Sequence, residues 1–401
     1  MVNLPRNVWI LAVAQALIMS VTSMVVFAGG IVGAQLAPAK TLSTFPVALM
    51  VIGTACAVAP VALLMKRIGR KRSFLFILLF SIGVALYTAY GIYLRSFYLF
   101  CSGTFLFGVT GACVMQFRFA AMESVKPEMI PKAVSSVLIG GIASAFIGPE
   151  AALLGRDLSV APFSGSFILV AGLFFMAFLV LLSFRDPVIE QAHISKTRRS
   201  IKEIAKQHVF WVAISSAAVG YVIMSFIMTA TPVSMHVMDG HSLQHTKLVI
   251  QSHVVAMYLP SLVTAWISAR LGIKRMLLTG LLSYVVCIGI AVVGHHLSNY
   301  WISLILLGVG WNFLFIGGTA LLPRSYRPEE RFKVQAVNEF VVFGSQAIAS
   351  VSAGWVVFAL GWESLLLATL PLILLQFIVT YRWLRDDSTE RALVPEKHAE
   401  R

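Results

Sequence analysis

The chain has 401 residues, of which 58% are hydrophobic and 12% are charged, and its formal net charge is +14. This is too few charged residues for the surface of a soluble protein of this size. The composition therefore excludes a soluble globular protein and indicates one that is embedded in a lipid bilayer. A strongly basic soluble protein often binds nucleic acid, but here the basic residues follow membrane topology, and we expect no nucleic-acid partner.

Apolar windows of about 19 to 23 residues recur along the whole chain, and each is long enough to cross the hydrocarbon core of a bilayer as a helix. In chain order, the windows cover approximately residues 8–30, 43–64, 73–93, 97–119, 133–154, 164–184, 209–232, 248–268, 276–294, 300–322, 334–357 and 364–384. The sequence therefore predicts an all-α integral membrane protein with twelve transmembrane helices.

The basic residues lie almost entirely on one side of these windows. Of the 31 Lys and Arg residues, only four fall on the other side, namely Lys40, Arg95, Arg156 and Lys247. Loops rich in Lys and Arg remain in the cytoplasm when a membrane protein is inserted. We therefore expect both termini, and the polar stretch in the middle of the chain, to be cytoplasmic.

The chain also contains an internal repeat. The loop Lys66-Arg67-Ile68-Gly69-Arg70-Lys71 follows the second window, and the similar loop Arg270-Leu271-Gly272-Ile273-Lys274 follows the eighth window, 203 residues later. Such a repeat is typical of two-lobed membrane carriers. The predicted organisation is an N-terminal six-helix lobe at 1–184, a basic cytoplasmic linker at 185–208, a C-terminal six-helix lobe at 209–385 and a cytoplasmic tail at 386–401.

This layout resembles the major facilitator superfamily over essentially all twelve windows. The loop signature of that family is Gly-x-x-x-Asp-Arg/Lys-x-Gly-x-Arg/Lys-Arg/Lys, and the chain has Ala62, Lys66, Arg67, Gly69, Lys71 and Arg72 at these positions. The basic residues and the central glycine match, whereas Lys66 stands where the family has an acid. The resemblance implies two six-helix lobes around a central cavity, transport by alternating access, and a monomer. It also implies a gating role for the two loops, through Lys66, Arg67, Gly69, Arg70, Lys71, Arg270, Gly272 and Lys274.

A narrower similarity links the chain to a bacterial subgroup of this family that includes riboflavin uptake carriers. It rests on the segments Asn7–Ala12, Arg118–Ala121 and Pro162–Phe167. The antiporter signature of the fifth helix is reduced to Gly141, Gly148 and Pro149, which weakens the interpretation as a drug–proton antiporter. The resemblance therefore favours import of a small organic solute across a bacterial inner membrane.

In a carrier of this layout, the first helix of each three-helix repeat is expected to line the cavity. Polar and aromatic side chains on these windows and on the eleventh are the candidate substrate contacts: Gln15, Thr22, Tyr221, Ser225, Thr229, Trp311, Asn312 and Gln346. Such groups hydrogen-bond a neutral ligand and pack on a ring, and they provide no fixed charge for a strongly ionic one. The alternative is that they hold neighbouring helices together.

Two carboxylates fall within the predicted helices. A charge near the bilayer centre costs about 2.5 to 3.5 kcal/mol on insertion scales, so its presence indicates a function. Glu150 and Glu339 are therefore the candidate proton-coupling residues. The alternatives are a water-exposed interfacial position for Glu150 and an ion pair of Glu339 with Arg331 or Lys333.

Arg118 and Glu123 lie where the fourth window reaches the cytoplasm. We expect them to form a gating salt bridge that breaks as the lobes rock. A fixed interfacial pair is the alternative, because exposed pairs contribute little energy.

Three histidines, His236, His241 and His245, lie in the longest loop on the outer side. Their spacing is compatible with a metal site or with pH sensing. No cysteine and no dense set of acids completes a site, so the sequence favours a solvated loop and predicts no bound metal.

The sequence lacks the nucleotide-binding and hydrolase motifs that mark an enzyme or an ATP-driven pump. We therefore expect no enzymatic activity and no cofactor, with energy supplied by a gradient. The predicted function is a proton-coupled secondary active transporter for a small organic solute, for example a neutral aromatic vitamin such as riboflavin. The alternatives are an exporter of drugs or siderophores and a membrane receptor or scaffold that no longer transports.

Overall fold

The computed structural model describes residues 4–126, 129–186, 199–327 and 330–393, and the regular elements within these ranges are helices. The N-terminal half contains α1 (Arg6–Leu36), η1 (Lys40–Leu42), α2 (Phe45–Ile68), α3 (Arg70–Tyr93), α4 (Phe97–Met115), α5 (Phe117–Glu123), α6 (Ile130–Arg156) and α7 (Ser164–Leu182). The C-terminal half contains α8 (Ile201–Ile204), α9 (His208–Pro232), η3 (Val233–Met238), α10 (Leu243–Tyr258), α11 (Ser261–Val293), α12 (Leu297–Leu321), η4 (Leu322–Ser325), α13 (Arg331–Leu360), α14 (Trp362–Leu367) and α15 (Leu370–Leu393).

Among the described residues, 11 helical segments are long and apolar enough to cross a membrane. They correspond to all the predicted windows except 248–268. That window is divided between α10 and the start of α11, because the helix is interrupted at Leu259 and Pro260. Proline has no N–H to donate and its ring collides with the preceding turn, so it breaks the helix. The predicted all-α membrane fold is confirmed, with the eighth pass built from two helices.

The loop predicted after the eighth window is absorbed into α11. This helix continues to Val293, with a non-helical residue at Gly272, whose φ is 74°. Gly69, at the matching position between α2 and α3, has a φ of 84°. Both values lie in the left-handed region, which glycine adopts without a steric penalty. The internal repeat therefore reflects the same backbone turn in both halves.

Glycines allow the first helix of the chain to pack closely against its neighbour. Gly140 and Gly148 of α6 face the backbone of α1 at Ala12 and Ser20, where a Cβ atom would collide with carbonyl oxygens. Lipid gives helices no hydrophobic drive to associate, so close backbone contact of this kind supplies much of the packing energy. The contact fixes the position of α1, which carries two of the candidate substrate residues.

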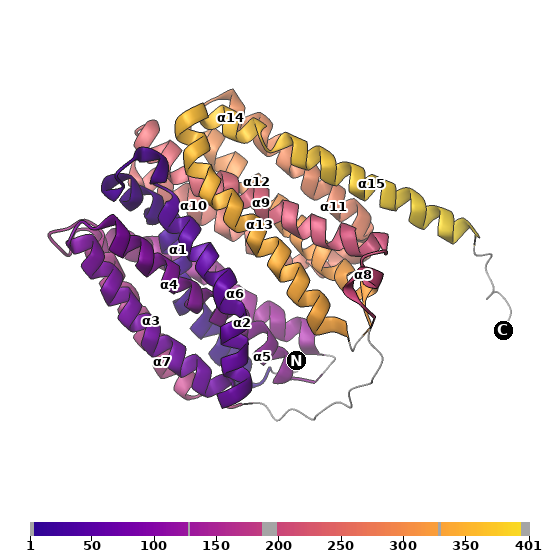
Figure 1. Cartoon of the computed structure of the whole chain (residues 1–401), viewed down its shortest axis with the longest axis horizontal. Helices are drawn as coiled ribbons and strands as arrows, with labels where there is room; N and C mark the ends of the chain where they lie inside the picture. Colours follow the sequence, from indigo (N-terminus) through magenta and orange to yellow (C-terminus); the bar gives the residue numbers. More distant parts are fainter. Residues whose placement is uncertain (1–3, 127–128, 187–198, 328–329, 394–401) are drawn as a thin grey trace.

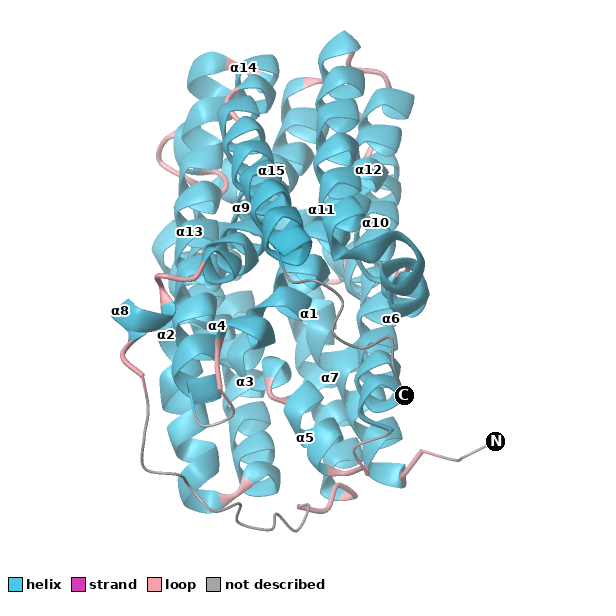
Figure 2. Cartoon of the chain, turned by 90° about the vertical axis from the view of Figure 1, so that its right-hand side faces the viewer, coloured by secondary structure: helices cyan, strands magenta, loops and turns pink. Residues whose placement is uncertain are grey.

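The two halves lie side by side. Figure 1 shows α1–α7 in purple tones at the lower left and α9–α15 in pink to yellow at the upper right, and Figure 2 shows the same halves one above the other. The seam between them is formed by α2 against α13, α6 against α10 and α1 against α9. Any site on this seam is built from both halves of the chain.

We call the end of the seam near Gly69 and Gly272 the basic end, and the end that carries η1, η3 and α14 the opposite end. At the opposite end, Val233 packs on Gly30 of α1, and Thr44 packs on Gly354 of α13. Thr44 has an exposed fraction of 1% and Val233 is fully buried. The opposite end of the seam is therefore closed by direct packing of the two halves.

Candidate functional site: a cavity between the two halves

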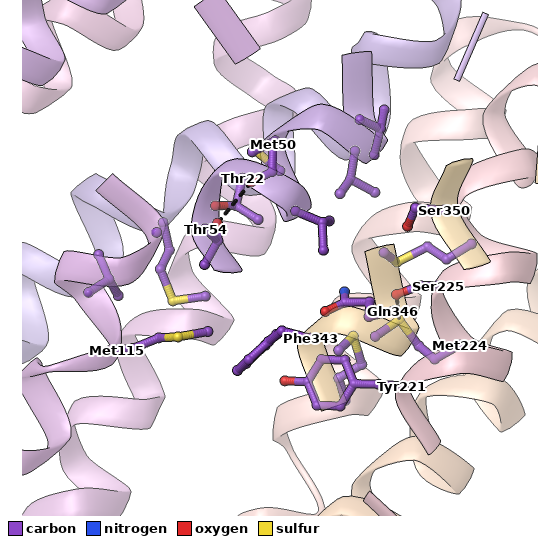
Figure 3. A pocket seen from close by; sticks show the side chains of 18 of the residues that line it. Thr22, Met50, Thr54, Met115, Tyr221, Met224, Ser225, Phe343, Gln346 and Ser350 are labelled. Atoms are coloured by element: carbon purple, nitrogen blue, oxygen red, sulfur yellow. Dashed lines mark hydrogen bonds between the residues drawn. The ribbon is translucent and has the colours of Figure 1, made fainter. Parts of the chain in front are cut away.

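A cavity of about 260 Å³ lies on the seam and is lined by α1, α2, α4, α5, α6, α9, α10, α12 and α13. Figure 3 shows part of its lining, with helices of the N-terminal half on the left and of the C-terminal half on the right. Seven of the eight predicted substrate contacts line it: Gln15, Thr22, Tyr221, Ser225, Thr229, Trp311 and Gln346. The sequence therefore placed most of its candidates at one common site.

Asn312 is the exception, and the structure corrects its placement. Its side chain is fully buried, and Nδ2 donates to the carbonyl oxygen of Met257 at 2.7 Å and to Oγ of Ser261 at 2.6 Å. Adjacent residues of a helix point about 100° apart, so Asn312 faces away when Trp311 faces the cavity. Asn312 holds α12 against the break between α10 and α11.

Several lining residues were not among the candidates that the sequence reasoning assigned to the cavity. Met50 and Thr54 lie four residues apart on α2, and Phe343 and Ser350 lie on α13 on the same face as Gln346. Spacings of three, four and seven residues place side chains on one helix face. This periodicity was visible in the sequence, but only the structure shows that these faces meet at the seam.

The lining is mainly apolar and rich in sulfur. Six methionines contribute to it: Met19, Met50, Met115, Met224, Met228 and Met257. Methionine is flexible and polarizable, and it makes favourable contacts with aromatic rings. Among the described residues that line the cavity, Arg118 is the only charged one. The site thus suits an uncharged, ring-containing ligand.

Aromatic side chains of the C-terminal half form a cluster on one part of the cavity wall, which we call the aromatic layer: Tyr221, Tyr258, Trp311 and Phe343. The ring of Tyr221 lies edge-on to Trp311 and Phe343, with centroid distances of 5.2 and 5.5 Å. Tyr258 contacts Trp311 at 6.0 Å. Edge-to-face packing of this kind holds each ring in place. The layer is therefore a rigid surface for a flat ring.

Trp311 carries an unsatisfied donor. Its Nε1 is buried, and no acceptor within the described part of the chain pairs with it. A buried N–H without a partner costs about 1 to 3 kcal/mol, so such groups usually mark a site that something else completes. Because Nε1 is buried, a ligand in the open cavity reaches the indole ring and not this N–H.

Arg118 of α5 and Glu339 of α13 connect the two halves beside the cavity. Nη2 of Arg118 donates to Oε1 of Glu339 at 2.9 Å. The sequence predicted Glu123 as the partner of Arg118, and for Glu339 it left an ion pair with Arg331 or Lys333 as the alternative to proton coupling. The structure contradicts the Arg118–Glu123 pair, because Arg118 reaches across the seam instead. The contact is therefore a bond between lobes rather than within one.

Glu123 is bound within its own half. Nε of Arg70 donates to Oε2 of Glu123 at 2.7 Å, and Nη2 of Arg70 donates to Oε1 at 2.5 Å. Next to this pair, Oδ1 of Asp186 accepts from the backbone N–H of Lys71 at 2.8 Å, at the start of α3. Lys66 stands where the family has an acid, and in this chain Asp186 supplies a carboxylate to the loop from the end of α7.

The remaining predicted gating residues lie on the surface of the basic end. Lys66, Arg67 and Arg270 are exposed. Nζ of Lys274 lies 5.0 Å from the ring centroid of Trp383 on α15. Such a cation–π contact is attractive. None of these four lines the described cavity.

Glu150 lies away from the cavity, near the opposite end. Its Oε1 accepts from Nζ of Lys247 at 2.6 Å, which joins α6 to α10 across the seam. The side chain of Glu150 is 49% exposed and that of Lys247 is 16% exposed. Glu150 therefore has both the ion pair and the access to water that fit an interfacial carboxylate.

The histidine loop forms contacts within itself. Nδ1 of His236 lies 2.7 Å from the carbonyl oxygen of His241, and the rings of His241 and His245 are 6.2 Å apart. Within the described residues, no group of three or more His, Cys, Asp or Glu side chains is arranged to hold a metal ion.

Comparison with known proteins identifies the family. The model of the Major Facilitator Superfamily matches residues 11–258 and 240–401. The riboflavin transporter RfnT of Brucella anthropi is 36% identical over 376 residues, which cover 93% of this chain and 94% of RfnT. The uncharacterized MFS-type transporter YddS of Bacillus subtilis is 29% identical and covers 88% of this chain and 86% of YddS.

A solved structure has the same fold. An inward-facing, unoccupied bacterial homolog of the human lysosomal transporter Spinster aligns with a TM-score of 0.69 and 12% identity, over 95% of this chain and 97% of the other. The predicted similarity to the subgroup that includes riboflavin carriers is also confirmed, by the match to RfnT. With its helical fold and the cavity on its seam, the chain belongs to the major facilitator superfamily and is a multi-pass membrane transporter for a small molecule.

Proposed function

We propose that this transporter carries riboflavin, or a flavin very close to it, into the bacterial cytoplasm as a proton-coupled monomer. The observation that carries the proposal is the 36% identity to RfnT, which extends over 93% of this chain. A monomer suffices because one chain supplies both walls of the cavity.

The chemistry of the cavity supports a flavin. Riboflavin combines a flat, uncharged tricyclic ring that bears carbonyl oxygens with a chain of hydroxyl groups. The aromatic layer and the lining methionines suit the ring, and Gln15, Thr22 and Gln346 offer hydrogen bonds to polar groups. The volume of about 260 Å³ lies just below the range of about 300 to 1,000 Å³ that is usual for small-molecule sites, which favours a compact solute over a lipid or peptide.

The proposed transport cycle uses the difference between the two ends of the seam. By the positive-inside rule, the basic end faces the cytoplasm of a bacterial inner membrane. The packing of Val233 on Gly30 and of Thr44 on Gly354 then closes the outer gate. The Arg118–Glu339 pair joins the lobes on the cytoplasmic side, and breaking it releases the substrate inward.

Proton coupling is assigned to Glu339 in preference to Glu150. The partner of Glu339, Arg118, lines the cavity, so a proton that neutralises Glu339 removes a contact between the lobes next to the substrate. A partly exposed pair of this kind contributes about 1 kcal/mol or less, so it breaks at modest cost within a cycle. Glu150 pairs with Lys247 outside the cavity and is the second candidate.

The proposal is tested by uptake in cells that lack their own flavin transporter. We expect radiolabelled riboflavin to accumulate above its external concentration only when the chain is expressed, faster in acidic than in neutral medium, and not after a protonophore is added. Absence of uptake despite confirmed membrane insertion contradicts import.

Two further outcomes identify the alternatives. Faster loss of preloaded flavin from expressing cells indicates an exporter. Saturable binding of flavin to membranes without uptake or loss indicates a receptor that no longer transports. Either result replaces the proposed function.

A further inference from the structure

The chemical character of the lining side chains changes along the length of the cavity. Tyr221, Ser225 and Thr229 follow one another on successive turns of α9, which runs from the basic end to the opposite end. Eight residues of helix rise about 12 Å, so Thr229 lies deeper than Tyr221 by roughly that distance. The wall therefore changes from aromatic near the basic end to hydroxyl-bearing toward the opposite end.

The neighbouring helix α13 repeats this order. Phe343 and Ser350 of α13 are separated by seven residues, in the same direction as on α9. Oγ1 of Thr229 and Oγ of Ser350 are 3.4 Å apart. Figure 3 shows Tyr221 and Phe343 together at one end of the cavity, Ser350 at the other end, and Gln346 between them. We call Thr22, Ser225, Thr229 and Ser350 the hydroxyl layer.

The two layers also differ in their surroundings. The described residues of the hydroxyl layer are uncharged, and the single charged lining residue, Arg118, lies on the side of the aromatic layer and is paired with Glu339. A phosphate group placed among hydroxyls and methionines would lose its water without gaining a cation, which is costly. The deep part of the cavity therefore suits a neutral polyol and rejects an anion.

From this grading we infer that the cavity holds its flavin in one orientation, with the tricyclic ring on the aromatic layer and the hydroxylated chain in the hydroxyl layer. The indole ring of Trp311 packs against the tricyclic ring of the flavin. Ser225 and Thr229 are specificity-determining residues for the polyol chain. The inference rests on the proposed function and extends it to a preference for the free vitamin over its phosphate.

A site built to hydrogen-bond a substrate hydroxyl discriminates against an analogue that lacks it. The experiment measures quenching of flavin fluorescence on the purified protein with three probes: riboflavin, lumiflavin, which has the ring but no polyol chain, and flavin mononucleotide. The variants are Ser225→Ala and Thr229→Val, which remove a hydroxyl, and Trp311→Phe, which replaces the indole with a smaller ring. Thr231→Val is the matched control, because Thr231 lies on α9 but bonds to the carbonyl of Ile227 outside the lining.

We expect Ser225→Ala and Thr229→Val each to weaken the binding of riboflavin about threefold to tenfold, which is the usual effect of one lost hydrogen bond. The binding of lumiflavin should stay unchanged. Trp311→Phe should weaken the binding of riboflavin and of lumiflavin by a similar factor. Thr231→Val should change the binding of neither. Flavin mononucleotide should bind to the unaltered protein at least about tenfold more weakly than riboflavin.

Each other outcome is decisive. The proposed orientation is overturned if the hydroxyl variants weaken the binding of riboflavin and of lumiflavin equally. It is also overturned if flavin mononucleotide binds as well as riboflavin. In both cases the proposed flavin transport stands. If the unaltered protein binds none of the three probes, the proposed function fails and the orientation fails with it.

Discussion

Arg118 and Glu339 are 221 residues apart in the sequence, yet Nη2 of one lies 2.9 Å from Oε1 of the other, across the seam between the halves. The side chain of Arg118 is 33% exposed and that of Glu339 is 24% exposed, so water and protons reach the pair. Arg118 also lines the cavity. One contact thus joins the lobes, borders the cavity and includes a carboxylate, which is the combination that the proposed proton coupling uses.

Replacing Glu339 by Gln removes the charge but keeps the shape. In the proposed cycle this variant mimics the protonated state permanently, so it should exchange external for internal riboflavin but accumulate none above about the external concentration. The measurement compares exchange with net uptake in the same cells. Full accumulation that still collapses with a protonophore would rule out Glu339 as the coupling residue.

Glu150→Gln tests the second carboxylate. Its pair with Lys247 is half exposed on the Glu150 side, and such pairs contribute about 0 to 1 kcal/mol. We expect uptake within about twofold of the unaltered protein and an unchanged response to pH. A loss of pH dependence in this variant, together with normal coupling in Glu339→Gln, would transfer the proton-coupling role to Glu150.

Gly354→Ala should keep the outer gate from closing. An added Cβ would collide with Oγ1 of Thr44 and lie 2.9 Å from the carbonyl oxygen of Thr41. Overpacking costs about 1 to 3 kcal/mol, which shifts the equilibrium between closed and open gates about 5- to 150-fold. We expect slower transport and faster labelling of a cysteine introduced at Ser234, which is buried at the opposite end.

Gly344→Ala is the matched control for this prediction, because it lies on the same helix with no atom within 4 Å of an added Cβ. It should leave both transport and labelling unchanged. Equal effects of the two alanines would show that the helix, rather than the gate contact, is sensitive to substitution.

His295 links the loops at the opposite end of the seam, and we expect it to make stability depend on pH. Nδ1 lies 2.8 Å from Oδ2 of Asp239 and Nε2 lies 2.6 Å from Oε1 of Glu363. The ring of Tyr300 and the side chain of His241, which reaches the carbonyl of His295, also border it. The hydrogen bonds to Asp239 and then to Glu363 raise the pKa of His295 above its usual value.

A raised pKa in the folded protein means that protonation stabilises the fold. The stabilisation is fully present below the unfolded pKa of about 6.5 and is lost as the pH rises through the folded pKa. The effect should be small, because the side chain is 41% exposed and solvent screens the pair. We therefore expect the melting temperature to fall as the pH rises through this window, and to fall less in His295→Gln.

His296→Gln is the control for the pH effect, since His296 is the exposed neighbour of His295. It should retain the pH dependence of the unaltered protein. A melting curve of His295→Gln with the same pH dependence as the unaltered protein would contradict the account of this contact.

The sequence predicts the fold well because each membrane pass leaves an apolar window of its own. It predicts the eighth pass as one helix because apolar character does not reveal the break at Pro260. Periodicity groups Tyr221, Ser225 and Thr229 correctly, since helical geometry alone places them on one face. Periodicity cannot show which face of a helix turns toward the seam. For this reason the sequence assigns Asn312 to the cavity, although its side chain bonds α12 to α10 and α11.

The partners of charged residues were the least predictable feature. Sequence proximity suggested that Arg118 would bind Glu123, but Glu123 is bound by Arg70 and Arg118 reaches Glu339 in the other half. The Arg118–Glu339 contact depends on how two lobes of about equal size are placed against each other. Nothing in the local sequence encodes that placement.

Riboflavin accumulation by the purified chain in proteoliposomes is the most direct test of the central claim. The vesicles contain only this protein, and an inwardly directed proton gradient is imposed or omitted. We predict that riboflavin is concentrated inside only with the gradient, and that Glu339→Gln vesicles exchange the vitamin without concentrating it. Riboflavin levels that equal those of protein-free vesicles, with and without the gradient, would contradict the account.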